Sequence, residues 1–253
     1  MKKKKNKKIE LKSILLFILA FLIFLISDYM LSETETEKTN TVAQENNTIQ
    51  TETNHNLSDD LTYSGQICID INNNEPFFEE KDLTEEVFEI YSNLDDLGRC
   101  GVAYANVCKD IMPKEGEKRG KISYKPTGWV QTIYNNGQAL YNRSHLIAWQ
   151  LGDENDNERN LITGTRQMNE AMIPWENQVA NWVKQQNKEG KDYHVLYRVT
   201  PHFIDTNLVA NGVEMEAKSV EDNGKGICFN KYIFNIQEGF EINYATGENK
   251  QIQ

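Results

Sequence analysis

Hydrophobic and polar positions divide the chain into three regions with different patterns. Residues 14–27 form an uncharged, almost entirely apolar run, whereas residues 32–60 are mostly Thr, Glu and Asn. From about residue 61, apolar positions recur with the spacings of strands and helices. The pattern predicts a globular domain over residues 61–253. A segment as poor in core-forming residues as 32–60 is expected to be a disordered linker.

Alternation of apolar and polar residues predicts most of the globular domain to be strands. The expected strands cover residues 99–107, 129–134, 139–141, 160–165, 193–200, 213–220, 227–235 and 240–245. Two short segments predict turns. Asn135-Asn136-Gly137-Gln138 favours a hairpin between the second and third of these strands, and Asp222-Asn223-Gly224 favours a turn before the seventh.

Helical spacing is restricted to two places. Asp82-Leu-Thr-Glu85 has the pattern of a capping box and predicts a helix to about Tyr91. The pattern becomes helical again at Arg166, and Pro174 marks the expected start of a second helical segment, which continues to about Gln186. The order of elements predicts an α+β fold in which a hairpin leads into a helix near the middle of the domain.

The N-terminus has the pattern of an export signal. Residues 1–12 carry seven Lys against one Glu, and the apolar run follows directly. No A-x-A cleavage site follows the run, which favours an uncleaved signal anchor over residues 1–31, and a cleaved signal peptide is the alternative. In both cases the lysines stay inside the cell and the rest of the chain is expected outside, either anchored to the membrane or secreted.

Charge does not decide the partner. The formal net charge of -11 argues against nucleic acid, whose phosphates attract Lys and Arg. Residues 118–188, however, hold nine Lys and Arg against six Asp and Glu, a net of +3. This local excess is compatible with a basic cleft on an acidic body, but it is also small enough to be incidental.

The cysteines are even in number and lie on the exported side, where disulfides persist. Four cysteines allow three pairings. We expect Cys68–Cys108 and Cys100–Cys228, with free buried thiols as the alternative for the second pair. No C-x-x-C pair occurs, which argues against a zinc site.

One histidine stands out among the four in the chain. His194 and His202 lie in expected strands and are interpreted as half-buried structural residues. His145 follows the predicted hairpin in the segment YNRSHLIAWQL, and Asn160, Asn169 and Glu176 come after it. By itself, such a histidine is a weak signal. We interpret the four tryptophans as core residues and residues 153–156 as a polar turn.

The surrounding motif is more specific. Residues 142–183 resemble the active-site region of the DNA/RNA non-specific endonucleases, a family of ββα-metal (His-Me finger) nucleases. The family motif D-R-G-H corresponds here to Asn142-Arg143-Ser144-His145. The resemblance extends over about 61–250 and includes LDDLGRCGVAYANV, KPTGW, NLITGTRQMN, YRVTP and VEMEAKSVEDNGKGICFN. Asn142 and Ser144 depart from the usual motif, which we expect to affect the rate and not the reaction class.

The resemblance implies a ββα-metal core with a central, mostly antiparallel sheet flanked by helices, and it implies a role for each site residue. His145 would be the general base that activates water, and Asn169 would bind Mg²⁺, with Mn²⁺ as a substitute. Glu176 would hold a water of the ion's hydration shell, Asn160 would orient that shell or the phosphate, and Arg143 would contact the phosphate. Arg119, Lys125 and Arg166 are weaker candidates for phosphate contacts.

The function that follows is a monomeric, extracytoplasmic, Mg²⁺-dependent endonuclease. It would hydrolyse DNA with little sequence specificity and leave 5′-phosphate ends, and RNA is an open second substrate. One alternative is a non-catalytic surface protein that binds or takes up DNA on the same fold. Another is a metal-dependent hydrolase that acts on a different phosphodiester or polymer.

Overall fold

The computed structural model of the chain describes residues 61–134 and 137–252. The predicted signal segment over 1–31 and the predicted linker over 32–60 lie outside these residues. Across the described ranges, no helix combines the length and apolar character required to cross a membrane.

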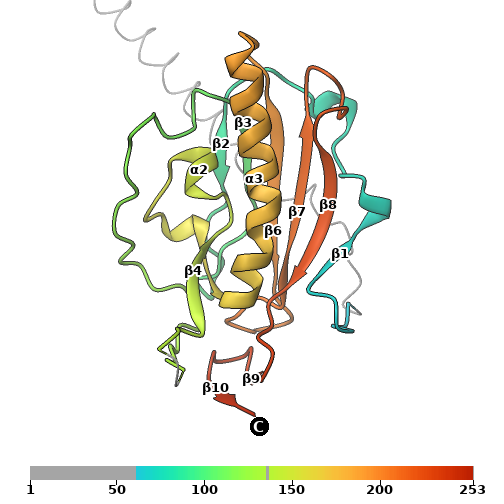
Figure 1. The fold of residues 1–253 in the computed structure, drawn as a ribbon. Helices are drawn as coiled ribbons and strands as arrows, with labels where there is room; N and C mark the ends of the chain where they lie inside the picture. The colour runs from blue at the N-terminus through green and yellow to red at the C-terminus, as the bar shows by residue number, and fades with distance from the viewer. Residues whose placement is uncertain (1–60, 135–136, 253) are drawn as a thin grey trace, which may run out of the picture. The chain divides into compact units, whose positions relative to one another are not determined.

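A six-stranded sheet forms the centre of the domain, and every neighbouring pair of its strands is antiparallel (Figure 1). The strand order is β1-β8-β7-β6-β3-β2. The strands are β1 (Cys68–Asp70), β2 (Glu89–Tyr91), β3 (Ala103–Val107), β6 (Val195–His202), β7 (Gly212–Ser219) and β8 (Cys228–Phe234). The two edge strands have three residues each. Short edges present few unpaired backbone groups to other chains.

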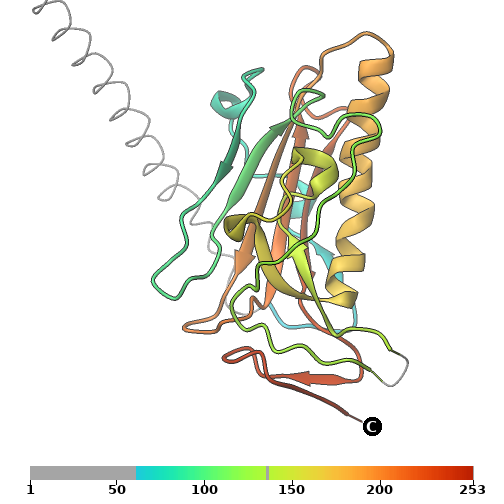
Figure 2. The same cartoon turned by 90° about the vertical axis from the view of Figure 1, so that its left-hand side faces the viewer.

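A second, two-stranded sheet leads directly into the main helix. Strands β4 (Tyr141–His145) and β5 (Leu161–Thr165) are antiparallel, with His145 opposite Leu161. Helix α3 (Arg166–Lys188) begins at the residue after β5. These three elements form a ββα unit, which lies against one face of the six-stranded sheet (Figure 2).

Helix α3 is held to the sheet by an apolar stripe. Met168, Met172, Val179 and Val183 are buried and recur at intervals of four or seven residues, which places them on one helical face. The Thr165 hydroxyl caps the start of the helix by accepting a hydrogen bond from the Met168 backbone N–H at 3.1 Å. Burial of this face offsets the helix-breaking tendency of Pro174, which lies within α3.

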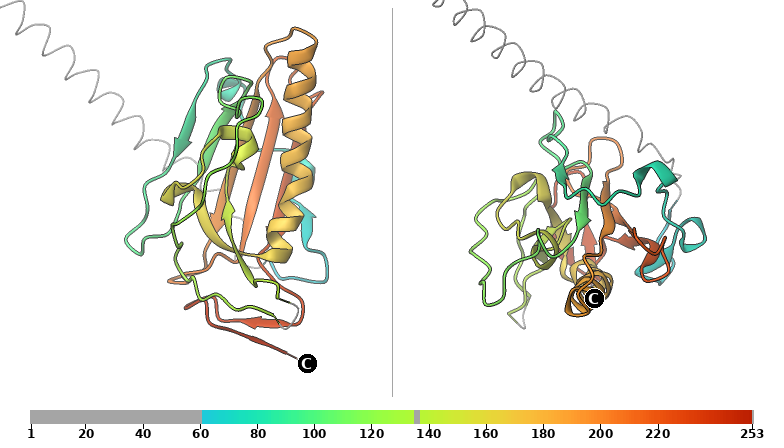
Figure 3. Two further views of the ribbon diagram at one scale, coloured as in Figure 1. Left: turned by 60° about the vertical axis from the view of Figure 1, so that its left-hand side comes forward. Right: turned by 90° about the horizontal axis from the view of Figure 1, so that it is seen from above.

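The opposite face of the sheet is covered by the segment that connects β1 to β2 (Figure 3). This segment contains the 3₁₀ helices η1 (Asn72–Asn74) and η2 (Glu80–Asp82). Phe78 stacks on Tyr104 of β3. The Phe77 backbone N–H donates to Glu216 at 2.8 Å, and Glu216 also forms a buried ion pair with Arg198. Both faces of the sheet are therefore covered.

The remaining elements are short. They are α2 (Trp149–Gly152), η3 (Glu158–Asn160), β9 (Phe240–Ile242) and β10 (Asn249–Gln251). The buried side chain of Asn235 accepts from the Thr165 backbone N–H at 2.8 Å and donates to the Thr163 and Ala210 carbonyls at 3.0 and 2.9 Å. These three hydrogen bonds fix the β5–α3 junction, from which the residues of the candidate site project.

The predicted α+β fold with a mostly antiparallel sheet is confirmed, and each of the four strands predicted after residue 190 overlaps a strand of the structure. The helix expected from Asp82 to Tyr91 is wrong. The capping box lies between Glu79 and Asp82 and closes only the short η2, after which the chain extends into β2. The second helical segment expected at Pro174 is also wrong, because α3 is continuous.

The hairpin is located differently from its prediction. Around residues 133–139 the described backbone forms a single bridge, between Ile133 and Ala139. The hairpin that leads into α3 is made by β4 and β5, whose strands are separated by fifteen residues that contain α2 and η3.

Both expected disulfides are wrong, because all four cysteines are free thiols. Cys68 lies in β1 and Cys108 directly follows β3, and three strands separate β1 from β3. Four interstrand steps of about 4.8 Å put the two strands roughly 19 Å apart, whereas a disulfide requires Cα atoms within about 7 Å. Cys100 contacts the carbonyls of Glu158 and Leu161, and Cys228 contacts Glu75. The free-thiol alternative for this second pair is the one that the structure shows.

Candidate active site

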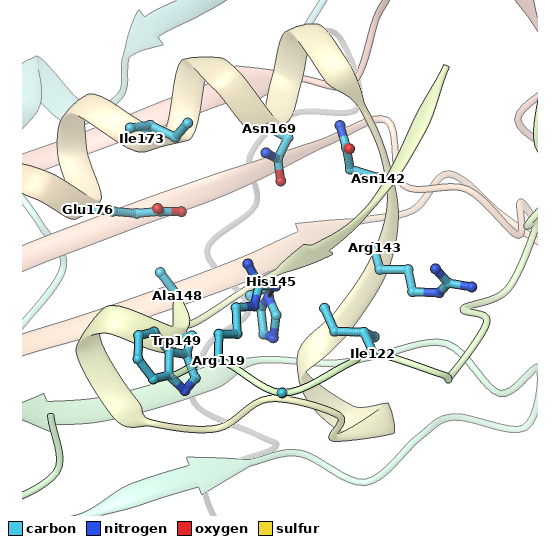
Figure 4. Close-up of a pocket in the computed structure, with 11 residues that line it drawn as sticks. Arg119, Ile122, Asn142, Arg143, His145, Ala148, Trp149, Asn169, Ile173 and Glu176 are labelled. Carbon is cyan, nitrogen blue, oxygen red and sulfur yellow. Dashed lines mark hydrogen bonds between the residues drawn. The ribbon is translucent and has the colours of Figure 1, made fainter. Parts of the chain in front are cut away.

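A cavity of about 470 Å³ lies beside the ββα unit. Its walls come from β4, α3, the residues around α2, and the backbone segment 119–122, which lies across the cavity from α3 (Figure 4). Five of the residues singled out from the sequence line it, namely Arg119, Arg143, His145, Asn169 and Glu176. Asn160, Lys125 and Arg166 do not.

Helix α3 supplies one wall of the cavity. Asn169, Ile173 and Glu176 are separated by four and three residues, so they lie on the same helical face. The side chains of Asn169 and Glu176 point from this face into the cavity, toward His145 (Figure 4). The capped first turn of α3 fixes the position of Asn169, and two further turns fix that of Glu176.

His145 is the last residue of β4, and both of its ring nitrogens have partners. Nε2 lies 2.8 Å from the backbone oxygen of Asn155, and Nδ1 lies 2.9 Å from Nη2 of Arg119. A carbonyl only accepts and a guanidinium only donates, so Nε2 must carry the proton and Nδ1 must hold the lone pair. The nitrogen that can accept a proton is therefore Nδ1.

The environment keeps this imidazole neutral. Burial of the ring lowers the pKa of His145 to about 4; the Asn155 carbonyl opposes this effect and the nearby charge of Arg119 reinforces it. At neutral pH the ring is therefore unprotonated at Nδ1 and can act as a base.

The pKa of Glu176 is shifted upward, whereas that of His145 is shifted downward. Burial raises the pKa of its carboxyl to about 7, although the charge of Arg119 and a hydrogen bond from Gln150 lower it. The protein therefore compensates only part of a negative charge on Glu176. A site that holds a carboxylate in this way favours a bound cation.

The oxygen atoms in the cavity fit a hard divalent cation. No protein group in the described ranges hydrogen-bonds to the side-chain amides of Asn142 and Asn169, which line the same cavity as Glu176. Nor do three or more His, Cys, Asp or Glu side chains gather anywhere in those ranges to hold a metal ion. A cation here would use amide oxygens, one carboxylate and water, a set that suits Mg²⁺ better than a metal that prefers nitrogen or sulfur.

Asn160 has a different environment from the one expected. It is fully buried, its Oδ1 accepts from the Ile147 backbone N–H at 2.8 Å, and its Nδ2 donates to the Ile147 carbonyl at 2.9 Å. Both polar atoms are therefore used by the backbone two residues after His145. Because Asn160 is fully buried and does not line the cavity, these contacts are those of a positioning residue.

Arg143 also makes contacts within the protein. Its Nε donates to the Tyr124 carbonyl at 2.5 Å, and its guanidinium lies 4.6 Å from the centre of the Trp129 ring. Figure 4 shows the side chain directed away from His145. The side chain of Lys125 is exposed, and Arg166 pairs with Glu170 at 3.7 Å. Arg119 is the one basic residue among these candidates whose guanidinium contacts His145.

Sequence reasoning missed Asn155, Asp156 and Trp149. The predicted polar turn is a turn, but Asn155 holds the His145 ring through its carbonyl, and Asp156 accepts from the Ser123 and Tyr124 backbone N–H groups at 3.0 and 2.9 Å. Trp149 lines the cavity although we assigned it to the core. Asp and Asn are typical of turns in general, so composition gave no indication of these long-range partners.

The substitution of Ser for the family's Gly at position 144 has a structural counterpart. Ser144 is fully buried, and its side chain lies against Gly164 on β5. A Cβ atom added to Gly164 would come within 2.2 Å of the Ser144 hydroxyl oxygen. The small residue at position 164 provides the space that the side chain at position 144 occupies.

Comparison with known proteins identifies the family of the chain. Residues 80–221 match the family model described as DNA/RNA non-specific endonuclease. This range contains β4, β5 and α3 together with every lining residue of the cavity.

Two solved nucleases are similar to the chain. NucA from Streptococcus agalactiae, solved with a magnesium ion bound, shares 27% identity over 72% of this chain and 85% of its own, with a TM-score of 0.62. The Sda1 nuclease, solved with a bound zinc ion, shares 29% identity over 63% of this chain and 80% of its own, with a TM-score of 0.53.

The fold and the site therefore define a nuclease of the ββα-metal class. The chain belongs to the DNA/RNA non-specific endonuclease family.

Proposed function

We propose that this protein is an exported, Mg²⁺-dependent endonuclease that hydrolyses DNA with little sequence specificity and leaves 5′-phosphate ends. The observation that carries the proposal is one cavity lined by Asn169, Glu176 and a His145 ring whose Nδ1 is unprotonated, because Nε2 donates to the Asn155 carbonyl. RNA is the second substrate to be tested.

His145 acts as the general base. Its Nδ1 accepts a proton from the attacking water while Nε2 stays hydrogen-bonded to the Asn155 carbonyl, which keeps the ring oriented. The same hydrogen bond stabilises the imidazolium formed when Nδ1 is protonated. Asn160 holds the backbone of Ile147, two residues after His145, and so helps to keep the His145 ring oriented.

Asn169 and Glu176 hold the cation, with Asn169 as the ligand and Glu176 as the carboxylate that positions a water of its hydration shell. Mg²⁺ is favoured by the oxygen donors, and NucA was solved with magnesium; Mn²⁺ is the expected substitute. When bound, the ion supplies positive charge that stabilises the charge developing on the phosphate and on the leaving 3′ oxygen.

Arg119 is the side chain best placed to contact the scissile phosphate, because its guanidinium lies at His145 within the cavity. A site that contacts phosphates carries no direct readout of bases, so low sequence specificity follows. The basic and apolar pattern of residues 1–27 supports export, with the nuclease domain outside the membrane and either anchored or released. We propose that the protein acts as a monomer.

The test is digestion of supercoiled plasmid DNA and of RNA by the full chain in Mg²⁺, in Mn²⁺ and in EDTA, beside the variant His145→Ala. We expect nicking and linearisation in Mg²⁺ and none in EDTA or with the variant. Binding of plasmid without any nicking in Mg²⁺ would instead favour a non-catalytic DNA-binding protein on this fold. Activity on a small phosphodiester but on neither nucleic acid would favour a hydrolase of another class.

A further inference from the structure

The atom that must accept a proton is covered by a neighbouring basic side chain. Nη2 of Arg119 donates to the lone pair of His145 Nδ1 at 2.9 Å, and Nε2 is occupied by the Asn155 carbonyl. A water molecule that must give its proton to Nδ1 has to replace this guanidinium. Nδ1 of His145 is therefore unprotonated, but the Arg119 guanidinium occupies its lone pair.

Arg119 is held by the same residue that orients the His145 ring. Nε of Arg119 donates to Oδ1 of Asn155 at 3.2 Å, and Nδ2 of Asn155 donates to the Lys121 carbonyl at 3.3 Å. Gly120 allows this close approach, because a Cβ at that position would come within 3.0 Å of Asn155 Nδ2. Asn155 thus fixes the positions of the base and of the basic side chain relative to each other.

The segment around Arg119 is fastened at its other end as well. Asp156 accepts hydrogen bonds from the Ser123 and Tyr124 backbone N–H groups and from the Ser123 hydroxyl. The backbone of residues 121–124 is therefore anchored to the turn that holds His145.

We propose that Arg119 caps the general base in the free enzyme and exchanges His145 for the substrate phosphate, with Asn155 as the positioning residue for that exchange. The proposal rests on the proposed nuclease function. A guanidinium binds a phosphate through charge-assisted, often bidentate hydrogen bonds, which are stronger than a single bond to a neutral imidazole. Arrival of a phosphate therefore draws Arg119 away and frees Nδ1. No proton moves in the exchange, because Arg119 stays charged and His145 stays neutral.

Modification by diethyl pyrocarbonate reports on the cap without any catalytic turnover. This reagent acylates an imidazole nitrogen that has a free lone pair, and the extent at His145 can be read by peptide mass spectrometry on the full chain in EDTA. We expect Arg119→Met, which keeps the length of the side chain, to accelerate modification of His145 by about fivefold, equivalent to roughly 1 kcal/mol for the lost hydrogen bond. His194 and His202 in the same samples serve as internal references.

Lys121→Met is the matched control. It removes one positive charge from the same segment, and the Lys121 side chain makes no described contact that would be lost. It should leave the His145 modification rate unchanged. Equal rates in the wild type and Arg119→Met, or equal acceleration by both substitutions, would overturn the cap.

Exchange is tested with dimethyl phosphate, a small phosphodiester anion that lacks bases. We expect it to accelerate modification of His145 in the wild type, relative to the same concentration of sodium chloride, and to have no effect in Arg119→Met. No acceleration in the wild type would overturn the exchange.

The role of Asn155 is tested by Asn155→Ala with Asn157→Ala as its control, since Asn157 lies in the same turn and bonds to Arg159 instead. The backbone carbonyl that holds His145 remains in both variants. We expect Asn155→Ala to uncap Nδ1 and to lower kcat/KM about tenfold, mainly through KM, because Arg119 is no longer held for the phosphate. The same modification rate and kinetics in both variants would remove Asn155 from this role.

Failure of this inference is distinguishable from failure of the nuclease assignment. If the protein cleaves nucleic acid normally but the modification rate of His145 is the same with and without Arg119, only the capping role of Arg119 is wrong. Modification that depends on Arg119 in a protein that cleaves no nucleic acid overturns the proposed function and with it the catalytic meaning of the contact.

Discussion

At the scale of single residues, the site is defined by one base and by the groups that prepare it. His145 is buried, hydrogen-bonded at Nε2 and neutral over most of the pH range. We predict that His145→Ala lowers plasmid cleavage by at least about 10²-fold, the lower range for loss of a general base. Circular dichroism should remain native-like, because the ring borders a cavity. His145→Gly should regain activity with added imidazole. Unchanged cleavage by the folded Ala variant would remove His145 from the mechanism.

Glu176 gives a prediction in which stability and function oppose each other. Its carboxyl has a pKa raised from 4.5 to about 7, so its contribution to stability is complete below pH 4.5 and is lost as the pH rises through 7. In EDTA at pH 8, Glu176→Gln should therefore be more stable than the wild type by about 2–3 kcal/mol. The two proteins should be equally stable near pH 4.5, and the variant should lose Mg²⁺-dependent cleavage. Urea unfolding at both pH values measures the difference, and equal stability at pH 8 contradicts the argument.

The candidate residues found from the sequence share one property. His145, Asn169 and Glu176 lie in a recognisable motif, and the motif implies their chemistry. Asn160 belongs to the same stretch, but its partner is the backbone of Ile147, which spacing does not indicate. Asn155 acts through contacts across the turn to the segment that carries Arg119. Residues whose role depends on long-range hydrogen bonds could not be found from one sequence.

At the scale of elements, the site depends on how β4, β5 and α3 are joined. The buried amide of Asn160 bonds to both backbone groups of Ile147. We predict that Asn160→Ala destabilises the protein by about 2–4 kcal/mol, because two buried backbone groups lose their partners. The rate should fall through the position of His145 and not through lost contact with substrate, so kcat should fall more than KM rises. Urea unfolding and steady-state kinetics check this, and a variant with normal stability, or one whose KM rises while kcat is unchanged, would contradict it.

The success of the element predictions follows the physics of each segment. Strands β6, β7 and β8 were predictable because each carries many apolar residues between clear turn signals. The helix predicted from Asp82 failed because a capping box stabilises only one turn, and residues 89–91 pair with β3 instead. Pro174 was misleading because tertiary packing of the α3 stripe outweighs the loss of one helical hydrogen bond.

At the scale of the whole molecule, no disulfide cross-links the described domain. All four are free thiols, and burial raises the pKa of Cys100 to about 12. We predict that Tm and activity are unchanged by a reducing agent and that four thiols react with a thiol reagent after unfolding without reduction. A fall in Tm of several degrees on reduction would show a disulfide and contradict the structure.

The distribution of charge determines how strongly the protein associates with DNA, a polyanion. The chain has a formal net charge of -11, yet the segment that borders the cavity is basic, with Lys118, Arg119 and Lys121 close together. Long-range electrostatic attraction between such a protein and DNA should be weak, and we expect direct contacts to about two or three phosphates. A plot of log kcat/KM for DNA against log salt concentration should therefore have a slope of about -2 to -3. Arg119→Met should reduce the magnitude of the slope by about one, because one phosphate contact is lost. A slope near zero would mean that phosphate contacts contribute little, and a much steeper slope would require a basic surface that extends beyond the cavity. Either result, measured with a fixed Mg²⁺ concentration, would contradict a local basic site on an acidic body.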